Sequence, residues 1–161
     1  MERFVNRFDL AADVLAQIQA CLGPGCDYSL FASRAIPPAE CNSIAVTYTD
    51  AMPEYESDCP ALQGCGYTQS HVLRIIITRC CVRADAGQSF SEVAEQDAAQ
   101  CLWRDVDLLE HCLACADLRQ WGIDHGITTF ERTATRFDVE TLGGCSSAYL
   151  DFRVVAEECC P

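Results

Sequence analysis

The sequence predicts an α+β fold in which one mostly antiparallel β-sheet packs against two α-helices, within a single domain over residues 1–161. The order of segments favours this fold: helix, strand, long loop, strand, long helix and strand hairpin. A length of 161 residues suits one core. Half of the residues are hydrophobic and 22% are charged, which is typical of a folded chain. No apolar run approaches the roughly 20 residues that a membrane helix needs, so we expect a soluble protein.

The first helix is expected over residues 8–22, where apolar residues recur at helical spacing. Gly23-Pro24-Gly25 should end it, because this tripeptide combines a C-terminal cap with a helix breaker. A strand is expected over residues 43–49, since Ile44, Val46 and Tyr48 alternate there with smaller or polar residues.

Residues 50–70 are expected to form a long acidic loop, because they combine prolines and glycines with four closely spaced carboxylates. The carboxylates are Asp50, Glu54, Glu56 and Asp58. Their spacing lacks the order of a calcium-binding loop, so the sequence favours a solvated loop over a metal site.

Residues 71–83 are rich in β-branched side chains and predict a central strand. Ser89 and Glu92 form a capping box, which predicts the start of a long helix. The expected apolar stripe of this helix includes Leu102, Leu109 and Leu113, with polar residues largely on the other side.

A C-terminal β-hairpin is expected over residues 130–156, with alternating runs at 132–140 and 148–154 and Gly143-Gly144 at the turn. One face of the first run alternates arginine with carboxylates, and burying that face would cost free energy. We therefore expect it to meet solvent or a neighbouring subunit.

Thirteen cysteines are the most unusual feature of the composition. The N-terminus has charges where a signal peptide would be apolar, which favours synthesis in a reducing cytoplasm. We expect four cysteines to serve as small hydrophobic residues in helix cores: Cys21, Cys101, Cys112 and Cys115. Four others lie near turns, where two of them could form a disulfide: Cys26, Cys41, Cys59 and Cys65.

The single Cys-x-x-Cys, Cys112 to Cys115 with His111 beside it, is a weak zinc signal because a second such pair is missing. We predict no metal and no cofactor. None of His71, His111 and His125 lies in a catalytic motif, and phosphate-binding and dinucleotide-binding loops are missing too. The sequence therefore predicts no catalytic residue and no enzyme. A net charge of −13 argues against a surface that binds nucleic-acid phosphates.

The chain resembles the tail terminators and related head–tail neck proteins of long-tailed bacteriophages, as encoded by phages of actinobacterial hosts. The resemblance rests on the pattern and order of four stretches: Cys41-Asn-Ser-Ile-Ala-Val-Thr-Tyr48; Gly64-Cys65-Gly66 before His71-Val-Leu-Arg-Ile-Ile-Ile-Thr-Arg-Cys80; the helix from Asp97 ending in Leu109-Glu-His-Cys112-Leu-Ala-Cys115; and Gly143-Gly-Cys-Ser-Ser-Ala-Tyr-Leu-Asp-Phe-Arg-Val-Val155. Basic residues that are all arginine agree with a GC-rich coding sequence.

This resemblance implies a tail-terminator-like fold and a structural virion protein, found in the tail or neck after assembly in the host cytoplasm. Such a protein forms a ring, commonly a hexamer, that ends polymerisation of the tail tube and joins the tail to the capsid connector. The implied partners are other copies of this chain, the major tail tube protein and the head-to-tail stopper or connector. Genomic DNA passes through without specific binding, and no membrane is involved.

Two residue sets follow from this expectation. Five arginines on strands are candidates for ion pairs between subunits: Arg74, Arg79, Arg132, Arg136 and Arg153. The acidic residues Asp50, Glu54, Glu56 and Asp58, or the outer face of the long helix, would line a channel that repels DNA phosphates. Two alternatives stay open: another ring-forming connector, either stopper or adaptor, and a cytoplasmic cysteine-rich metal or thiol protein.

Overall fold

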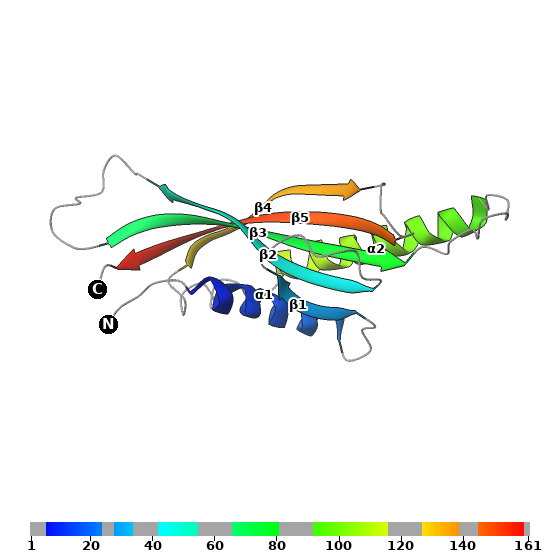
Figure 1. Ribbon diagram of the computed structural model, residues 1–161, viewed down its shortest axis with the longest axis horizontal. Helices are drawn as coiled ribbons and strands as arrows, with labels where there is room; N and C mark the ends of the chain where they lie inside the picture. The colour runs from blue at the N-terminus through cyan, green and yellow to red at the C-terminus, as the bar shows by residue number, and fades with distance from the viewer. Residues whose placement is uncertain are drawn as a thin grey trace.

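The computed structural model describes residues 6–23, 28–33, 42–54, 66–80, 92–115, 127–138 and 145–159. These residues form five strands and two helices. In chain order the elements are α1 (Arg7–Leu22), β1 (Ser29–Ser33), β2 (Ser43–Glu54), β3 (Gly66–Cys80), α2 (Glu92–Cys115), β4 (Ile127–Asp138) and β5 (Cys145–Cys159). The strands form one sheet in the order β1-β2-β3-β5-β4 (Figure 1). Only the β1–β2 pair is parallel, so the predicted α+β fold with a mostly antiparallel sheet is confirmed.

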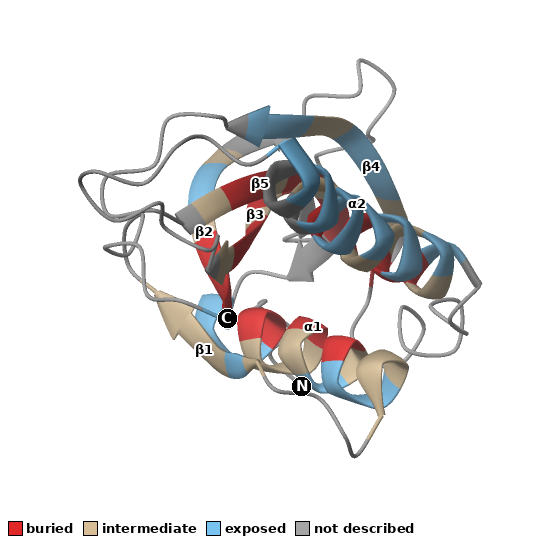
Figure 2. Ribbon diagram, turned by 90° about the vertical axis from the view of Figure 1, so that its right-hand side faces the viewer, coloured by how far each residue is buried: buried red, intermediate tan, exposed pale blue. Residues whose placement is uncertain are grey.

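Both helices cover the same face of the sheet, and the core lies between them and that face (Figure 2). Alternate residues of the central strands point into this core, as the period of two in a strand requires. β3 contributes Leu73, Ile75 and Ile77, which are fully buried. Ile18 of α1 and Leu109 of α2 pack against them. Each such aliphatic side chain contributes about 1.5–3 kcal/mol when it leaves water.

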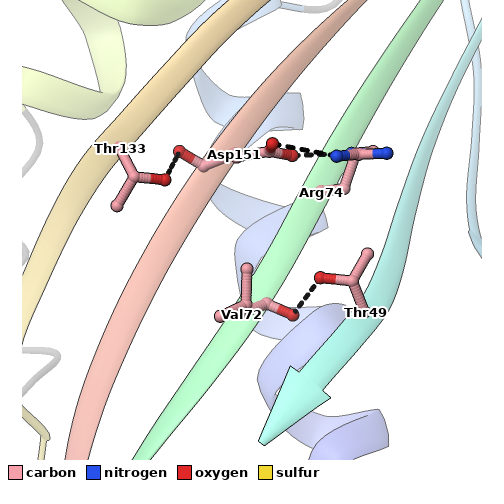
Figure 3. A network of polar contacts seen from close by, with 5 residues as sticks. All are labelled: Thr49, Val72, Arg74, Thr133 and Asp151. Atoms are coloured by element: carbon pink, nitrogen blue, oxygen red, sulfur yellow. Dashed lines mark hydrogen bonds and ion pairs between the residues drawn. The ribbon is translucent and has the colours of Figure 1, made fainter.

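The outer strands carry β-bulges that set which side chains face the core. Thr49 of β2 and Thr133 of β4 are the extra residues at two of these irregularities. Each threonine hydroxyl donates to a carbonyl on the neighbouring strand, Thr49 to Val72 and Thr133 to Asp151, at 3.1 Å in both cases (Figure 3). These bonds tie the irregular positions to the central strands.

The segment predicted as a loop over residues 50–70 is partly strand, which corrects that expectation. β2 continues to Glu54 and β3 begins at Gly66, and the two pair in register across this region. β1 pairs only with Ser43–Thr47, so Pro53 lies on an open edge, where a residue without an N–H is tolerated. The loop prediction was wrong over these strand residues, because proline and closely spaced carboxylates occur here within a strand. The short strand β1 was also not predicted.

Local capping fixes both ends of α1. The Asn6 side chain accepts hydrogen bonds from the backbone N–H groups of Phe8 and Asp9, at 2.9 and 3.3 Å. At the other end Gly23 has a φ of 76°, a conformation that glycine adopts without steric cost, and its N–H bonds to the Gln19 carbonyl. The predicted end of this helix is thus confirmed. For α2, Ser89 lies outside the described residues, so its role as a cap is not tested.

A disulfide between Cys21 and Cys112 links α1 to α2, with the two Cα atoms 5.8 Å apart. This corrects the expectation that both cysteines serve only as hydrophobic core residues. The pairing arises because α1 and α2 lie side by side on the sheet, which brings together residues 91 positions apart. Cys101 is exposed and free rather than in the core, and the side chain of Cys115 lies outside the described residues.

A second link, made by polar side chains, joins α2 to the sheet. The Tyr28 hydroxyl, just before β1, donates to the Asp105 carboxylate on α2. The Arg79 guanidinium, on β3, donates to the same carboxylate at 2.5 Å and to the Tyr28 oxygen at 2.7 Å. Burial, and then the hydrogen bond to Asp105, raises the pKa of the Tyr28 phenol above its ordinary value.

The disulfide gives a first prediction. Replacing Cys21 with serine, or reducing the protein, should lower the free energy of unfolding by about 2–5 kcal/mol, because the bond closes a long loop in the unfolded chain. Urea denaturation of the oxidised and reduced protein measures this difference. Cys101→Ser, at the exposed free thiol, is the matched control and should change stability by less than about 0.5 kcal/mol. Equal stability of the oxidised and reduced forms would contradict the prediction.

The Tyr28 cluster gives a second prediction. Because the folded pKa lies above the unfolded one, the neutral phenol contributes stability that is present below about pH 10 and is lost as the pH rises further. Stability should therefore fall more steeply above about pH 10 in the native protein than in Tyr28→Phe. The difference in phenolate absorbance between the two proteins gives the titration directly. A midpoint for Tyr28 at the ordinary tyrosine value would show that this account is wrong.

Candidate functional site

The best-defined hollow in the described part of the structure is a groove between α2 and β4. Two hollows of about 590 and 460 Å³ lie there, and both are lined by Asp107, Glu110 and Arg132. The helix and the strand run in opposite directions along it, since Leu113 lies near Phe130 at one end and Val106 near Phe137 at the other. We call this hollow the α2–β4 groove.

A carboxylate bridge spans the middle of the α2–β4 groove. One oxygen of Glu110 accepts from the Thr135 hydroxyl, and the other pairs with the Arg132 guanidinium. Both partners belong to β4, so a single side chain of α2 holds the edge strand. The floor is apolar, with Phe130 and Phe152 stacked at a centroid distance of 5.0 Å.

The rim of the α2–β4 groove is acidic and aromatic. Asp107 is exposed and forms no ion pair with any residue in the described ranges. Phe137 is 46% exposed, and Trp103, one helical turn before Asp107 on the same side of α2, is 56% exposed. Carboxylates beside exposed aromatic rings favour a partner that presents a cation next to an apolar side chain.

The arginines predicted to lie between subunits are mostly engaged within the chain. Arg74 pairs with Asp151 through two hydrogen bonds of 2.6 and 2.9 Å (Figure 3), and its guanidinium lies 5.5 Å from the centre of the Tyr149 ring. The other internal pairs are Arg79 with Asp105, Arg132 with Glu110, and Arg153 with Glu131. Among these five, Arg136 alone makes no ion pair with the described residues and is exposed.

Two of these arginines, Arg79 and Arg132, lie on the face of the sheet that the helices cover. Arg79 shares the helix-covered face with Ile77, which is how it reaches Asp105 on α2. The bulge at Thr133 shifts the alternation in β4, so Arg132 faces α2 while Arg136 pairs in register with Tyr149 on the opposite face. Arg132 and Arg136 therefore lie on opposite faces, which corrects the expectation of one face that alternates arginine with carboxylates over residues 132–140. Residues 139–140 lie outside the described residues.

The predicted channel residues are only partly placed. Asp50 is exposed at the bulge of β2, where its side chain accepts from the Ala51 N–H at 2.7 Å. Glu54 is the last residue of β2, whereas Glu56 and Asp58 lie outside the described residues. The register places Glu157 of β5 opposite Thr68, which in turn pairs with Glu54. The backbones of acidic residues from two strands are thus in register at this end of the sheet.

The thiols predicted near turns, Cys26, Cys41, Cys59 and Cys65, all lie outside the described residues, so their pairing is not tested. Of the histidines, His71 is buried with its Nδ1 against the Tyr48 hydroxyl, His111 lies at the groove, and His125 is not described. Over the described ranges, three or more potential metal ligands do not gather at any point. The described helices also contain no stretch long and apolar enough to cross a membrane.

The α2–β4 groove was not predicted from the sequence, because the groove depends on the distance between α2 and the edge strand β4. One weak signal was available in the sequence. Trp103 lies on the polar side of the helical pattern, where a large aromatic side chain remains exposed and indicates a contact surface.

Comparison with known proteins adds no assignment, since no family model matches the chain and no curated protein matches it.

The bridge across the groove gives a third prediction. Glu110→Ala should lower the free energy of unfolding by about 1–2 kcal/mol, because it removes one partly exposed ion pair and one hydrogen bond. A double-mutant cycle with Arg132→Ala should give a coupling of about 0.5–1 kcal/mol. Asp97→Ala, on the exposed side of the same helix, is the control. Additive effects of the Glu110 and Arg132 substitutions would show that the bridge does not form in solution.

Proposed function

We propose that this chain is a structural protein of a bacteriophage tail, which assembles into a ring that ends tail-tube growth and joins the tail to the capsid connector. The major tail tube protein and a head-to-tail stopper or connector are its proposed partners, with DNA passing through the ring. The proposal takes its starting point from the resemblance in sequence pattern.

The observation that carries the proposal is the acidic end of the sheet. β2, β3 and β5 extend beyond α1 at one end of the molecule (Figure 1). Asp50 and Glu54 of β2 and Glu157 and Glu158 of β5 are placed there by the register. If these strands point into a ring, their carboxylates repel phosphate groups, which suits a channel that DNA crosses without binding.

The fold supports the terminator over the other connector proteins. A stopper would be expected to be mostly a β-barrel, and an adaptor mainly helical. The observed open sheet with two helices on one face is neither. The zinc or thiol alternative is less well supported, because Cys112 of the Cys-x-x-Cys is already bonded to Cys21.

Assembly in solution gives the fourth prediction. Each copy carries a net charge of −13, so copies repel one another at low salt and should associate better at about 0.15 M, where the Debye length is about 8 Å. We expect native mass spectrometry and negative-stain images to show a closed ring, with a hexamer as the expected size. A protein that stays monomeric at high concentration across this salt range would overturn the proposal.

The channel is tested separately with the ring intact. Replacing Asp50, Glu54, Glu157 and Glu158 with lysine should leave the ring closed and give it an affinity for DNA in a gel-shift assay. The same number of substitutions on the outer side of α2, including Asp97→Lys, tests the other expected channel face at the same total charge. Equal DNA binding by the two charge variants would place the channel elsewhere.

A further inference from the structure

The start of α1 presents a cation beside an aromatic ring. Phe8 is 69% exposed, the most exposed large hydrophobic side chain in the described ranges. Arg7, next to it, is exposed, and its guanidinium lies 5.0 Å from the centre of the Tyr48 ring. Arg7 forms no ion pair with any residue that the structure describes. We call Arg7 and Phe8 the α1 tip.

The α2–β4 groove has the complementary chemistry. Asp107 offers an exposed carboxylate on its rim, and the exposed ring of Phe137 lines the same hollow. The exposed ring of Trp103 lies one helical turn before Asp107 on α2. A guanidinium from outside would gain an ion pair with Asp107, and a phenyl ring would gain apolar contact with aromatic neighbours. Neither gain is made among the described residues of one copy.

The α1 tip and the groove are far apart on the same molecule. The disulfide fixes Cys21 beside Cys112, and the α1 tip lies about 20 Å further along the helix at 1.5 Å per residue. Figure 1 shows α1 beginning near one end of the molecule, whereas α2 extends toward the other. Contact between them must therefore join two copies, and because the two surfaces differ, it is a head-to-tail contact of the kind that closes rings.

Pairing of sheet edges is a weaker route to the same assembly. β4 has two register irregularities and carries Glu131 and Arg136 along its length, and bulges and charges both discourage strand addition. The open edge of β2 contains a bulge at Thr49 and Pro53, which has no N–H to donate. The α2–β4 groove offers a binding surface that does not depend on strand addition at these two edges.

We propose that the α1 tip of one copy docks into the α2–β4 groove of the next, with Arg7 against Asp107 and Phe8 between the exposed rings of Trp103 and Phe137. This contact rests on the proposed ring function and specifies its subunit interface. Each copy would use its α1 tip to contact one neighbour and its α2–β4 groove to contact the other.

A charge-swap experiment tests the contact. Arg7→Glu and Asp107→Arg should each weaken self-association by about tenfold or more, because each places like charges opposite one another. Mixing the two variants restores opposite charges at every contact, so the mixture should assemble within about threefold of the native protein. Native mass spectrometry and analytical ultracentrifugation measure the assembly. Phe8→Ser provides a second variant, which removes the phenyl ring from the contact without changing the net charge of the protein.

The controls match the charge changes outside the contact. Arg104→Glu and Asp97→Arg alter exposed residues on α2 that do not line the groove, and both should assemble like the native protein. Thermal unfolding confirms that each variant is folded; glutamate in the first turn of a helix is a favourable replacement. Rings that persist in Arg7→Glu, Asp107→Arg and Phe8→Ser would overturn the docking contact and leave the ring function standing. Failure of the mixture to assemble would also overturn it. A native protein that never forms rings would overturn both.

Discussion

The pairing of β3 with β5 is the interaction on which the rest of the structure depends. The two strands are matched over all fifteen residues of each, and they occupy the middle of the sheet. Every other element is placed relative to them: β2 and β4 pair along their outer sides, and the helices cover their apolar face. Arg74 and Asp151 cross this pair on the opposite face, where the charges satisfy each other. The β3–β5 pair has an unbroken register, whereas β2 and β4, which flank it, contain bulges.

Sequence patterns predicted the centre better than the edges. Residues 71–83 and the two helices were recognisable because long apolar runs and helical spacing report burial directly. The edges depend on details that a simple period does not report. A bulge at Thr133 places Arg132 and Arg136 on opposite faces, and Pro53 is tolerated because no described strand pairs with β2 on its outer side there. The disulfide and the α2–β4 groove arise from packing between distant segments, and neither leaves a local pattern in the sequence.

The distribution of charge bears on how the proposed ring could form from an acidic chain. Most of the described arginines are used inside the fold, where they hold α2 and the strands together. In the proposed ring, the described arginines that make no ion pair with described residues, Arg7 among them, would act as specific contact points against a repulsive background. Specificity of this kind comes as much from the repulsion that prevents wrong contacts as from the attraction at the right one.

The link between Cys21 and Cys112 also changes how the protein responds to mechanical force. A pull applied between the two ends of the chain cannot extend the segment between these cysteines while the bond is intact, since the force passes through the sulfurs. That segment contains β1, β2 and β3, including one strand of the central pair. Unravelling under tension is therefore confined to the N-terminal part of α1 and the chain that follows Cys112.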